Sequence, residues 1–551
     1  VLPSLSSSWI EDQLSLLSER GFIIPRTDSH QADYAFRHVL TSDAIYSTLL
    51  RRDRGELHGQ VGEAIELLFA DRLSEYIYLL ARHYSWSPRL DRALYYLILA
   101  GQKSARDYIN AQAREYFEQA LQLLSKVEHE NAQAFEVYLG LGDTMVFSGE
   151  YEKAREQYRV CQKLLDTANT DETKSDVVLQ RKIGQTYERQ GDYEQALKYL
   201  NQAHQLLDEC HTELVVERAE VWNDIGWIHF RRGNFEEAGE ILQRALDLVA
   251  GSSAYGVIAS INNRLGGVAY YQGDWDQAAS YLRSSITIRE SIGDVAGLAS
   301  SSNNLGNLEI EMGLFDEALD DLKRNFALVK RLGQVEGIAV AYNNLGWLYT
   351  LRGETDLAKQ SLDEALELAR QIGFSSLIRE VRKNLGELYL ALKQWDQARE
   401  ALLEVLQAFD ELSLNDQTIN IYRLLGEAAL GENSLDQAQK WAARIETAIK
   451  IGTPLPALQQ GEILRFRGML AIQEQNLPQA KAYLVESLTI FRSLHSRLNV
   501  GRTLIQMCRL ATAQGLKSQA QEYCSEAMQI FTEIGACLDT RRVEHLLSEI
   551  S

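Results

Sequence analysis

Asparagines recur at one interval through the middle of the chain, and their side chains have the chemistry to bind an extended peptide. An asparagine amide offers two donors and one acceptor, so a row of amides at a fixed rise can hydrogen-bond a peptide backbone. Asparagine is a mediocre helix former, and its recurrence at one register therefore indicates a role in binding. The alternative is that these amides satisfy neighbouring backbone groups or cap loops. The two rows contain Asn223, Asn263, Asn303 and Asn343, spaced 40 residues apart, and Asn304, Asn344 and Asn384.

Aromatic side chains accompany the asparagines in the same register. Trp227, Asn307 and Trp347 share one position of the repeat, and Tyr270 stands three residues further along its own unit. Such rings can stack on a small molecule such as a sugar, or they can pack within the fold. The first of these leaves open a second function, the sensing of a small molecule.

Basic residues lie near one end of the same rows. Arg181, Arg231 and Arg264 fall in three neighbouring units, whereas acidic residues are spread along the whole series. We therefore expect the ligand to be a protein or peptide with acidic side chains next to a short apolar stretch.

The elements that carry these side chains follow from a 40-residue repeat. A period in this range indicates an array of stacked units that bury their faces against one another. An alanine stands twelve residues after each glycine of the repeat, as Ala358 does after Gly346. The doublets in strict register are Ile225-Gly226, Leu265-Gly266, Leu305-Gly306, Leu345-Gly346, Leu385-Gly386 and Leu425-Gly426.

One unit, residues 341–370, predicts two helices. Apolar residues recur at helical spacing on both sides of Gly353, which suits the left-handed end of a helix. We expect Asn433 to take the place of this glycine in a later unit. Gly346 and Ala358 are small because they stand where the two helices cross.

These motifs resemble the tetratricopeptide repeat (TPR), whose usual length is about 34 residues. The longer unit is most similar to the repeats of kinesin light chains and Pins-type adaptors, which implies peptide contacts through matching asparagines. The resemblance also implies an all-α fold, a right-handed superhelical solenoid of about twelve helix pairs. We expect this TPR superhelix over residues 71–535 and a C-terminal capping helix over 536–551.

The first 70 residues have a different pattern, which predicts a partial winged-helix module and a connecting helix. The segment around Tyr34-Ala35-Phe36-Arg37-His38 resembles the junction between the ATPase core and the repeats in bacterial STAND signalling ATPases, some of them linked to a nucleotide cyclase. The resemblance implies that His38 senses ATP or ADP bound to an upstream ATPase domain of the intact parent. The expected elements are a helix at 11–20, strands at 21–24 and 34–37 joined by a turn, and a helix from 41.

No nucleotide-binding P-loop motif occurs in the chain, and it begins at Val1 rather than at a methionine. We therefore expect a fragment of a larger signalling protein, with its ATPase domain upstream. We expect no cofactor, no metal and no catalytic residue in this fragment, because the motifs of hydrolases and metalloenzymes are also absent.

Composition excludes several classes of partner. The net charge of −21 argues against nucleic acid, which requires a basic face. No apolar run approaches the roughly 20 residues of a membrane span, and no secretory signal is present. A cytoplasmic location follows, and we expect Cys161, Cys508 and Cys524 to be free buried thiols. The predicted function is a non-catalytic protein-binding or peptide-binding sensor and scaffold.

Overall fold

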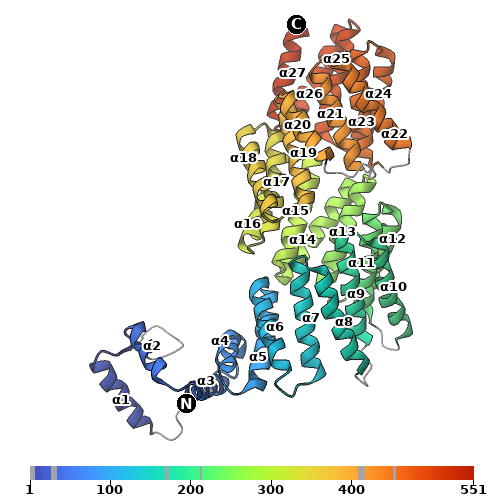
Figure 1. The fold of residues 1–551 in the computed structure, drawn as a ribbon. Helices are drawn as coiled ribbons and strands as arrows, with labels where there is room; N and C mark the ends of the chain where they lie inside the picture. Colours follow the sequence, from blue (N-terminus) through green and yellow to red (C-terminus); the bar gives the residue numbers. More distant parts are fainter. Residues whose placement is uncertain are drawn as a thin grey trace. The chain divides into compact units, whose positions relative to one another are not determined.

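The computed structural model describes residues 6–25, 34–167, 173–210, 214–407, 416–450 and 455–550. Within these ranges the chain consists of helices and one two-stranded sheet, so the predicted all-α superhelical class is confirmed (Figure 1). The chain divides into two compact units, which we call the first unit, Val1–His211, and the second unit, Thr212–Ser551. None of the helices in the described ranges has both the length and the apolar character that a bilayer crossing requires.

The first unit begins with the elements that the sequence predicts. Helix α1 (Ser7–Glu19) precedes strands β1 (Ile23–Pro25) and β2 (Tyr34–Phe36), which pair antiparallel, and α2 (Val39–Thr48) follows. Residues 26–33, most of the predicted turn, lie outside the described residues. That these elements end a winged helix remains a prediction.

Helix hairpins make up the rest of the first unit. Their buried residues include Leu80, Tyr84, Phe117 and Leu141, so the degenerate repeats before residue 141 have a core of their own. The helices are α3 (Arg51–Leu68), α4 (Leu73–Ser85), α5 (Leu90–Arg106), α6 (Asn110–Leu124), α7 (Asn131–Phe147), α8 (Tyr151–Thr167), α9 (Thr173–Gln190) and α10 (Tyr193–Glu209).

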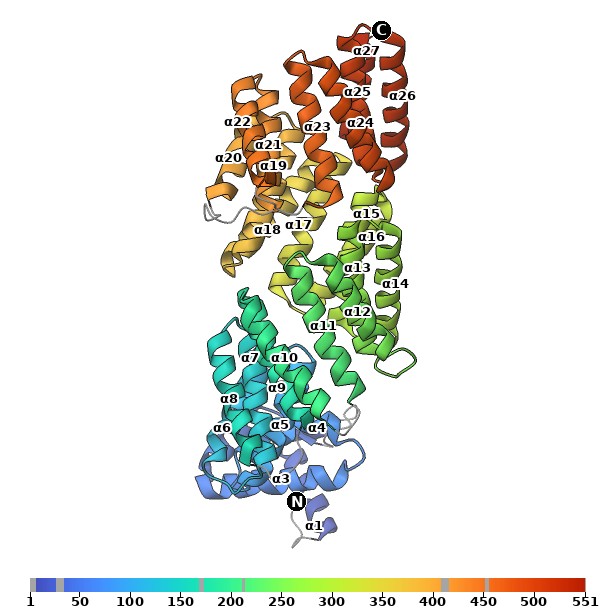
Figure 2. The same ribbon diagram turned by 90° about the vertical axis from the view of Figure 1, so that its right-hand side faces the viewer.

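The second unit continues with hairpins of an odd-numbered first helix and an even-numbered second helix (Figure 2). Its first helices are α11 (Val215–Arg231), α13 (Tyr255–Gln272), α15 (Val295–Met312), α17 (Val335–Arg352), α19 (Ser375–Ala391), α21 (Asp416–Gly431), α23 (Ala457–Gln473) and α25 (Arg497–Ala513). Its second helices are α12 (Phe235–Leu248), α14 (Trp275–Ile292), α16 (Phe315–Arg331), α18 (Thr355–Gln371), α20 (Trp395–Gln407), α22 (Leu435–Lys450), α24 (Leu477–Ser493) and α26 (Lys517–Ile534). Helix α27 (Cys537–Ile550), close to the expected cap, packs on α26.

A contact between a glycine and a leucine 16 residues later sets how closely the two helices of a hairpin approach. A Cβ added to Gly346 would lie 2.7 Å from Cγ of Leu362 and 3.2 Å from its backbone nitrogen. The small residues therefore stand at the helix crossing, as predicted. The same contact is made by Gly226 with Leu242, Gly266 with Leu282, Gly306 with Leu322 and Gly386 with Leu402.

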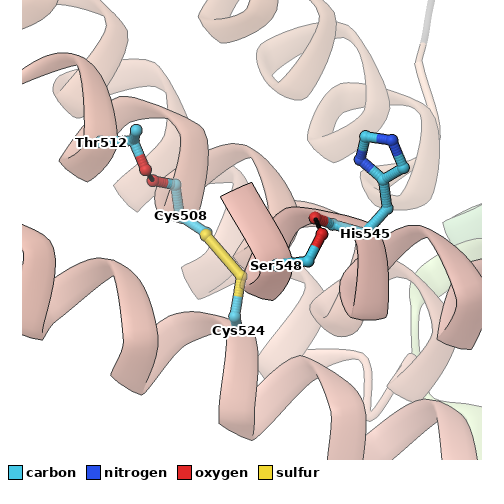
Figure 3. Close-up of a disulfide and its surroundings, with 5 residues drawn as sticks. All are labelled: Cys508, Thr512, Cys524, His545 and Ser548. Carbon is cyan, nitrogen blue, oxygen red and sulfur yellow. Dashed lines mark hydrogen bonds between the residues drawn. A yellow bond between two sulfur atoms is a disulfide. The ribbon is translucent and has the colours of Figure 1, made fainter. Parts of the chain in front are cut away.

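The last hairpin places two cysteines at these same positions. Cys508 of α25 and Cys524 of α26 are 16 residues apart, their Cα atoms are 5.9 Å apart, and they form a disulfide (Figure 3). The prediction that both are free thiols was therefore wrong, because it considered only close pairs such as Cys-x-x-Cys. Cys161 is buried and free, as expected.

Loop geometry repeats even where the glycine does not. Gly353 has φ 80° and Asn433 has φ 59°, as the repeat predicts. Lys393 and Gln475 occupy the equivalent positions with φ 59° and 61°, although neither residue type favours that region. The packing of the hairpin therefore imposes the left-handed turn on whatever residue stands there.

Successive turns of the second unit contact one another after five hairpins. Helix α25 packs against α15 and α27 against α17, and Figure 2 shows α25 above α15. The Ser496 hydroxyl donates to the carbonyl oxygen of Glu311 at 3.1 Å, and Arg542 donates to that of Ala391 at 2.9 Å. Phe531 and Ile534 share one core cluster with Ile310 and Leu348. The inner faces of the first helices are therefore enclosed rather than open along one side.

Replacing Gly346 with alanine tests the helix crossing. We expect a loss of about 1–3 kcal/mol in the free energy of unfolding, because the new methyl group overlaps Leu362. Urea unfolding of the full chain measures this. Gly256→Ala on α13 is the matched control, because a Cβ there meets nothing within 4 Å, and we expect it to be neutral or stabilising. Equal effects of the two substitutions would contradict the packing account.

Substitution of the two cysteines tests whether positions 508 and 524 make the same contact as the glycine and leucine of the other hairpins. Under reducing conditions we expect Cys508→Gly and Cys524→Leu each to destabilise the protein, and the double variant to recover stability by restoring the glycine–leucine contact. A double-mutant cycle measured by urea unfolding should give a favourable coupling of at least about 0.5 kcal/mol. Additive effects would show that the two positions are independent.

Candidate functional site

The second unit encloses a cavity of about 520 Å³. Residues from all its first helices, α11 through α25, line it, together with Leu282 of α14 and Val405 of α20. This volume falls within the range of small-molecule binding sites. Part of the face that the sequence predicts as a binding groove is therefore the wall of this cavity.

The asparagine rows form hydrogen bonds between neighbouring repeats. Asn304 donates to Asn263 Oδ1 at 3.1 Å, Asn344 to Asn303 Oδ1 at 2.8 Å, and Asn384 to Asn343 Oδ1 at 2.9 Å. Each bond joins one first helix to the next. The alternative considered from the sequence was bonding to neighbouring backbone groups or loops, whereas these amides bond asparagine side chains of the next repeat.

Some polar groups of the cavity wall keep an acceptor without a partner. Asn343 also donates to Asn344 at 3.2 Å, so the amides form one directed chain from Asn384 to Asn303. Asn384 is the donor end of this chain, and its buried Oδ1 has no hydrogen-bond partner within the described structure, although its residue is only 2% exposed. The same holds for Oδ1 of Asn307 and Oε1 of Gln459. A buried acceptor left unsatisfied costs about 1–3 kcal/mol, so these three oxygens destabilise the wall in this arrangement.

The structure brings together part of the predicted site. The predicted residues that line the cavity are Trp227, Asn263, Tyr270, Asn304, Asn307, Asn344, Trp347 and Asn384. Those that do not line it are Asn223, Asn303, Asn343, Arg181, Arg231 and Arg264.

The basic residues predicted to attract acidic side chains have other surroundings. Arg264 donates to Asp224 at 3.0 Å and to the carbonyl oxygen of Asn223 at 2.6 Å. Arg181 belongs to α9 of the first unit. His38, the predicted nucleotide sensor, precedes α2 of the first unit and is exposed. The preference for acidic peptides therefore finds no support from this cavity.

Aromatic rings lie at one side of the cavity. Trp227 stacks on Phe230 with ring centroids 5.0 Å apart, and Tyr270 meets Tyr271 edge to face at 5.3 Å. All four rings line the cavity, as does Trp347. The rings both pack against one another and present faces to a ligand.

Charged side chains also line the cavity. The repeat register predicts Glu311, Lys383 and Glu387 on this face, whereas it does not predict Arg423, Glu462 and Arg502 there. The basic ones are paired: Lys383 with Glu380 at 2.5 Å, Arg423 with Glu427 and Glu462, and Arg502 with Asp539 at 3.0 Å. Arg379 is not free either. Among the described residues no ion pair involves the carboxylates of Glu311 and Glu387. The repeats after residue 430 are degenerate, so the repeat pattern does not predict that Glu462 and Arg502 belong to the site.

Burial changes the ionisation of the two unpaired carboxylates. Burial, reinforced by the nearby carboxylates of Glu462 and Glu387, raises the pKa of Glu311 to about 8. Lys383 and Arg502 oppose this shift without cancelling it. Burial also raises the pKa of Glu387, and Lys383 and Arg423 oppose that shift. Glu311 is therefore largely protonated at neutral pH.

Comparison with known families agrees with this geometry. The MalT-like TPR region matches residues 106–291, and two tetratricopeptide-repeat families match 297–371 and 384–411. The repeats form a tetratricopeptide-repeat region. Its resemblance to TPR proteins, predicted from the sequence, is thus confirmed, whereas a STAND ATPase parent remains a proposal.

One curated relative covers a short part of the TPR chain. It is an uncharacterized protein, R02095 of Rhizobium meliloti (strain 1021), 27% identical over 138 residues. The match covers 25% of this chain and 13% of the relative's length.

Solved structures with similar repeats differ widely in sequence. A Rap protein complexed with competence and sporulation factor has TM-score 0.47 and 14% identity, covering 65% of this chain and 97% of its own. The apo quorum sensor NprR from B. thuringiensis has TM-score 0.45 and 16% identity, with coverages of 63% and 99%. The TPR-like repeats of a Podospora anserina putative kinesin light chain have TM-score 0.31 and 16% identity, with coverages of 37% and 98%.

The raised pKa of Glu311 predicts how its substitution changes stability with pH. The pKa of the Glu311 carboxyl group is near the ordinary value of 4.5 in the unfolded chain and about 8 in the folded protein. Glu311 therefore makes its full contribution to the free energy of unfolding below pH 4.5, and this contribution is lost as pH rises towards 8. We expect Glu311→Gln to raise the melting temperature at pH 8 by about 2 °C or more, and by less at pH 5.

Thermal unfolding of the full chain across this pH range measures the effect. Glu317→Gln is the control, because Glu317 is exposed at the start of α16. A Glu311→Gln curve parallel to the wild-type curve would contradict the pKa shift.

Proposed function

We propose that the second unit is a non-catalytic binding region that takes a short peptide segment into its cavity. The observation that carries this proposal is the cavity wall itself, where asparagine amides and aromatic rings from consecutive first helices meet around one enclosed volume. Asparagine amides are groups that can both donate to and accept from a peptide backbone, and several of them line the cavity. TPR arrays are typically binding structures, and we assign this one no catalytic step.

A small organic molecule is the second candidate. The cavity volume of about 520 Å³ favours it, because a long extended peptide needs an open groove. Trp227, Tyr270 and Trp347 supply faces on which such a molecule can stack. Both candidates place the ligand at the same residues.

We also propose that this region acts as the sensor of a larger signalling ATPase. Ligand binding in the second unit would shift the population of two states of the parent protein. The N-terminal helix–strand–strand–helix segment with His38 would pass this change to an ATPase domain that binds ATP or ADP. The elements of this segment support the proposal, since they follow the order that the resemblance implies.

Filling the cavity tests the binding function. Gly267 lines the cavity, and a Cβ there meets only ordinary contacts with Phe230 at 3.7 Å, so Gly267→Leu inserts a side chain without a backbone clash. A panel of amino acids, oligosaccharides, nucleotides and defined pentapeptides can be screened by thermal shift on the full chain. We expect Gly267→Leu to weaken any cavity ligand at least about tenfold, because it removes volume that the ligand occupies.

Gly256→Leu on the same helix is the matched control, since its position is exposed and meets nothing within 4 Å. It should bind like the wild type. Ligands that bind both variants equally well would place the binding site elsewhere. Pentapeptides alone among the hits would favour the first candidate, and oligosaccharides or nucleotides alone would favour the second.

A further inference from the structure

The groups of the cavity that lack partners are acceptors and acids. Glu311 and Glu387 line the cavity from α15 and α19, and no ion pair involves either of them among the described residues. Asn307, Asn384 and Gln459 line the same cavity, and each has a side-chain oxygen without a hydrogen-bond partner in that part of the chain. These amide oxygens are buried behind the cavity surface, so the two carboxylates are the groups that a ligand with N–H donors can match.

The basic side chains Lys383, Arg423 and Arg502 of the cavity wall already form ion pairs. Lys383, Arg423 and Arg502 each pair with a carboxylate, so an anionic ligand would have to compete with existing ion pairs. Separating a buried pair leaves an uncompensated charge, which is strongly unfavourable. Residues of both charges line the cavity, but among the described residues the lining groups without an ion pair include the carboxylates of Glu311 and Glu387.

The aromatic side of the cavity also suits a cation. Tyr270 and Trp347 line it, and the negative electrostatic potential of an aromatic ring face attracts ammonium and guanidinium groups. Arg264 and Arg231 already lie over the Trp227 ring, with Cζ 5.4 Å and 5.8 Å from its centroid. The same kind of contact is thus present at the edge of the site.

We propose that the cavity recognises an organic cation, a primary ammonium or guanidinium group, which Glu311 and Glu387 bind as carboxylates. This inference rests on the proposed function and adds the chemical class of the ligand. The cation can belong to a basic residue of a peptide or to a free amine, since both present the same donors.

Proton release accompanies this binding. The groups that face Glu311 are Glu387 and Lys383 of α19, Glu462 of α23 and Arg502 of α25, and together with burial they keep Glu311 mostly protonated below pH 8. A bound cation favours the ionised form, so binding expels a proton. Affinity for the cation therefore rises as pH increases from 6 to about 8 and then levels off.

Calorimetric titration of the full chain with defined probes tests the inference. The probes are agmatine and spermidine as free cations, and capped tripeptides with a central arginine, glutamine or glutamate as peptide sources. We expect a cationic probe to bind at least about tenfold more tightly than its uncharged or acidic counterpart. Glu311→Gln should weaken that probe by a similar factor and remove the rise in affinity with pH, whereas Glu317→Gln should do neither.

The outcomes distinguish the cation inference from the proposed binding function of the cavity. Tight binding by agmatine or spermidine identifies a free amine, and tight binding by the arginine tripeptide alone identifies a peptide. If the glutamine or glutamate peptide binds as tightly as the arginine peptide, and Gly267→Leu still blocks it, the cation inference is wrong while the cavity function stands. If no cationic probe binds at about 10 mM, a concentration that reveals even weak sites, the inference is overturned. Binding that Gly267→Leu leaves unchanged overturns both claims.

Discussion

The contact between a glycine on the first helix and a leucine 16 residues later is the constraint on which the second unit depends. It limits how closely a hairpin closes, and the five hairpins from Gly226 to Gly386 make it with the same leucine atoms. These five hairpins are therefore alike, and each first helix contacts the next. That regularity places the asparagines of neighbouring repeats within hydrogen-bond distance. The cysteine pair of the last hairpin occupies the same two positions with a different chemical bond.

Regular stacking also produces the cavity. After five hairpins the array returns to itself, and α25 meets α15 at Ser496 and Glu311. This contact turns part of the inner face into the wall of a cavity, where charges interact more strongly than in open solvent. Paired cations and unpaired carboxylates then acquire different roles, since the first stabilise the wall and the second remain open to a ligand. The cavity therefore depends on this contact between α15 and α25 as much as on any single residue that lines it.

The sequence predicted the fold well because its signals are local. Hairpins, glycine turns and the helix crossing at Gly346 all follow from spacing within one unit. The site was predicted only in part, because closure joins residues about 185 positions apart and leaves no periodic mark. Glu462 and Arg502 stand in degenerate units, and the asparagine rows gave no sign that one amide would donate to the next. The disulfide was missed for the same reason, since its two cysteines are related by the repeat rather than by a motif.

A crystal structure of the full chain, soaked with the tightest-binding compound, tests the central claim most directly. The account predicts α25 in contact with α15 and ligand density between Glu311, Glu387 and Trp347. Density on the outer face of the second helices would contradict it, and so would an open array in which Ser496 lies far from Glu311.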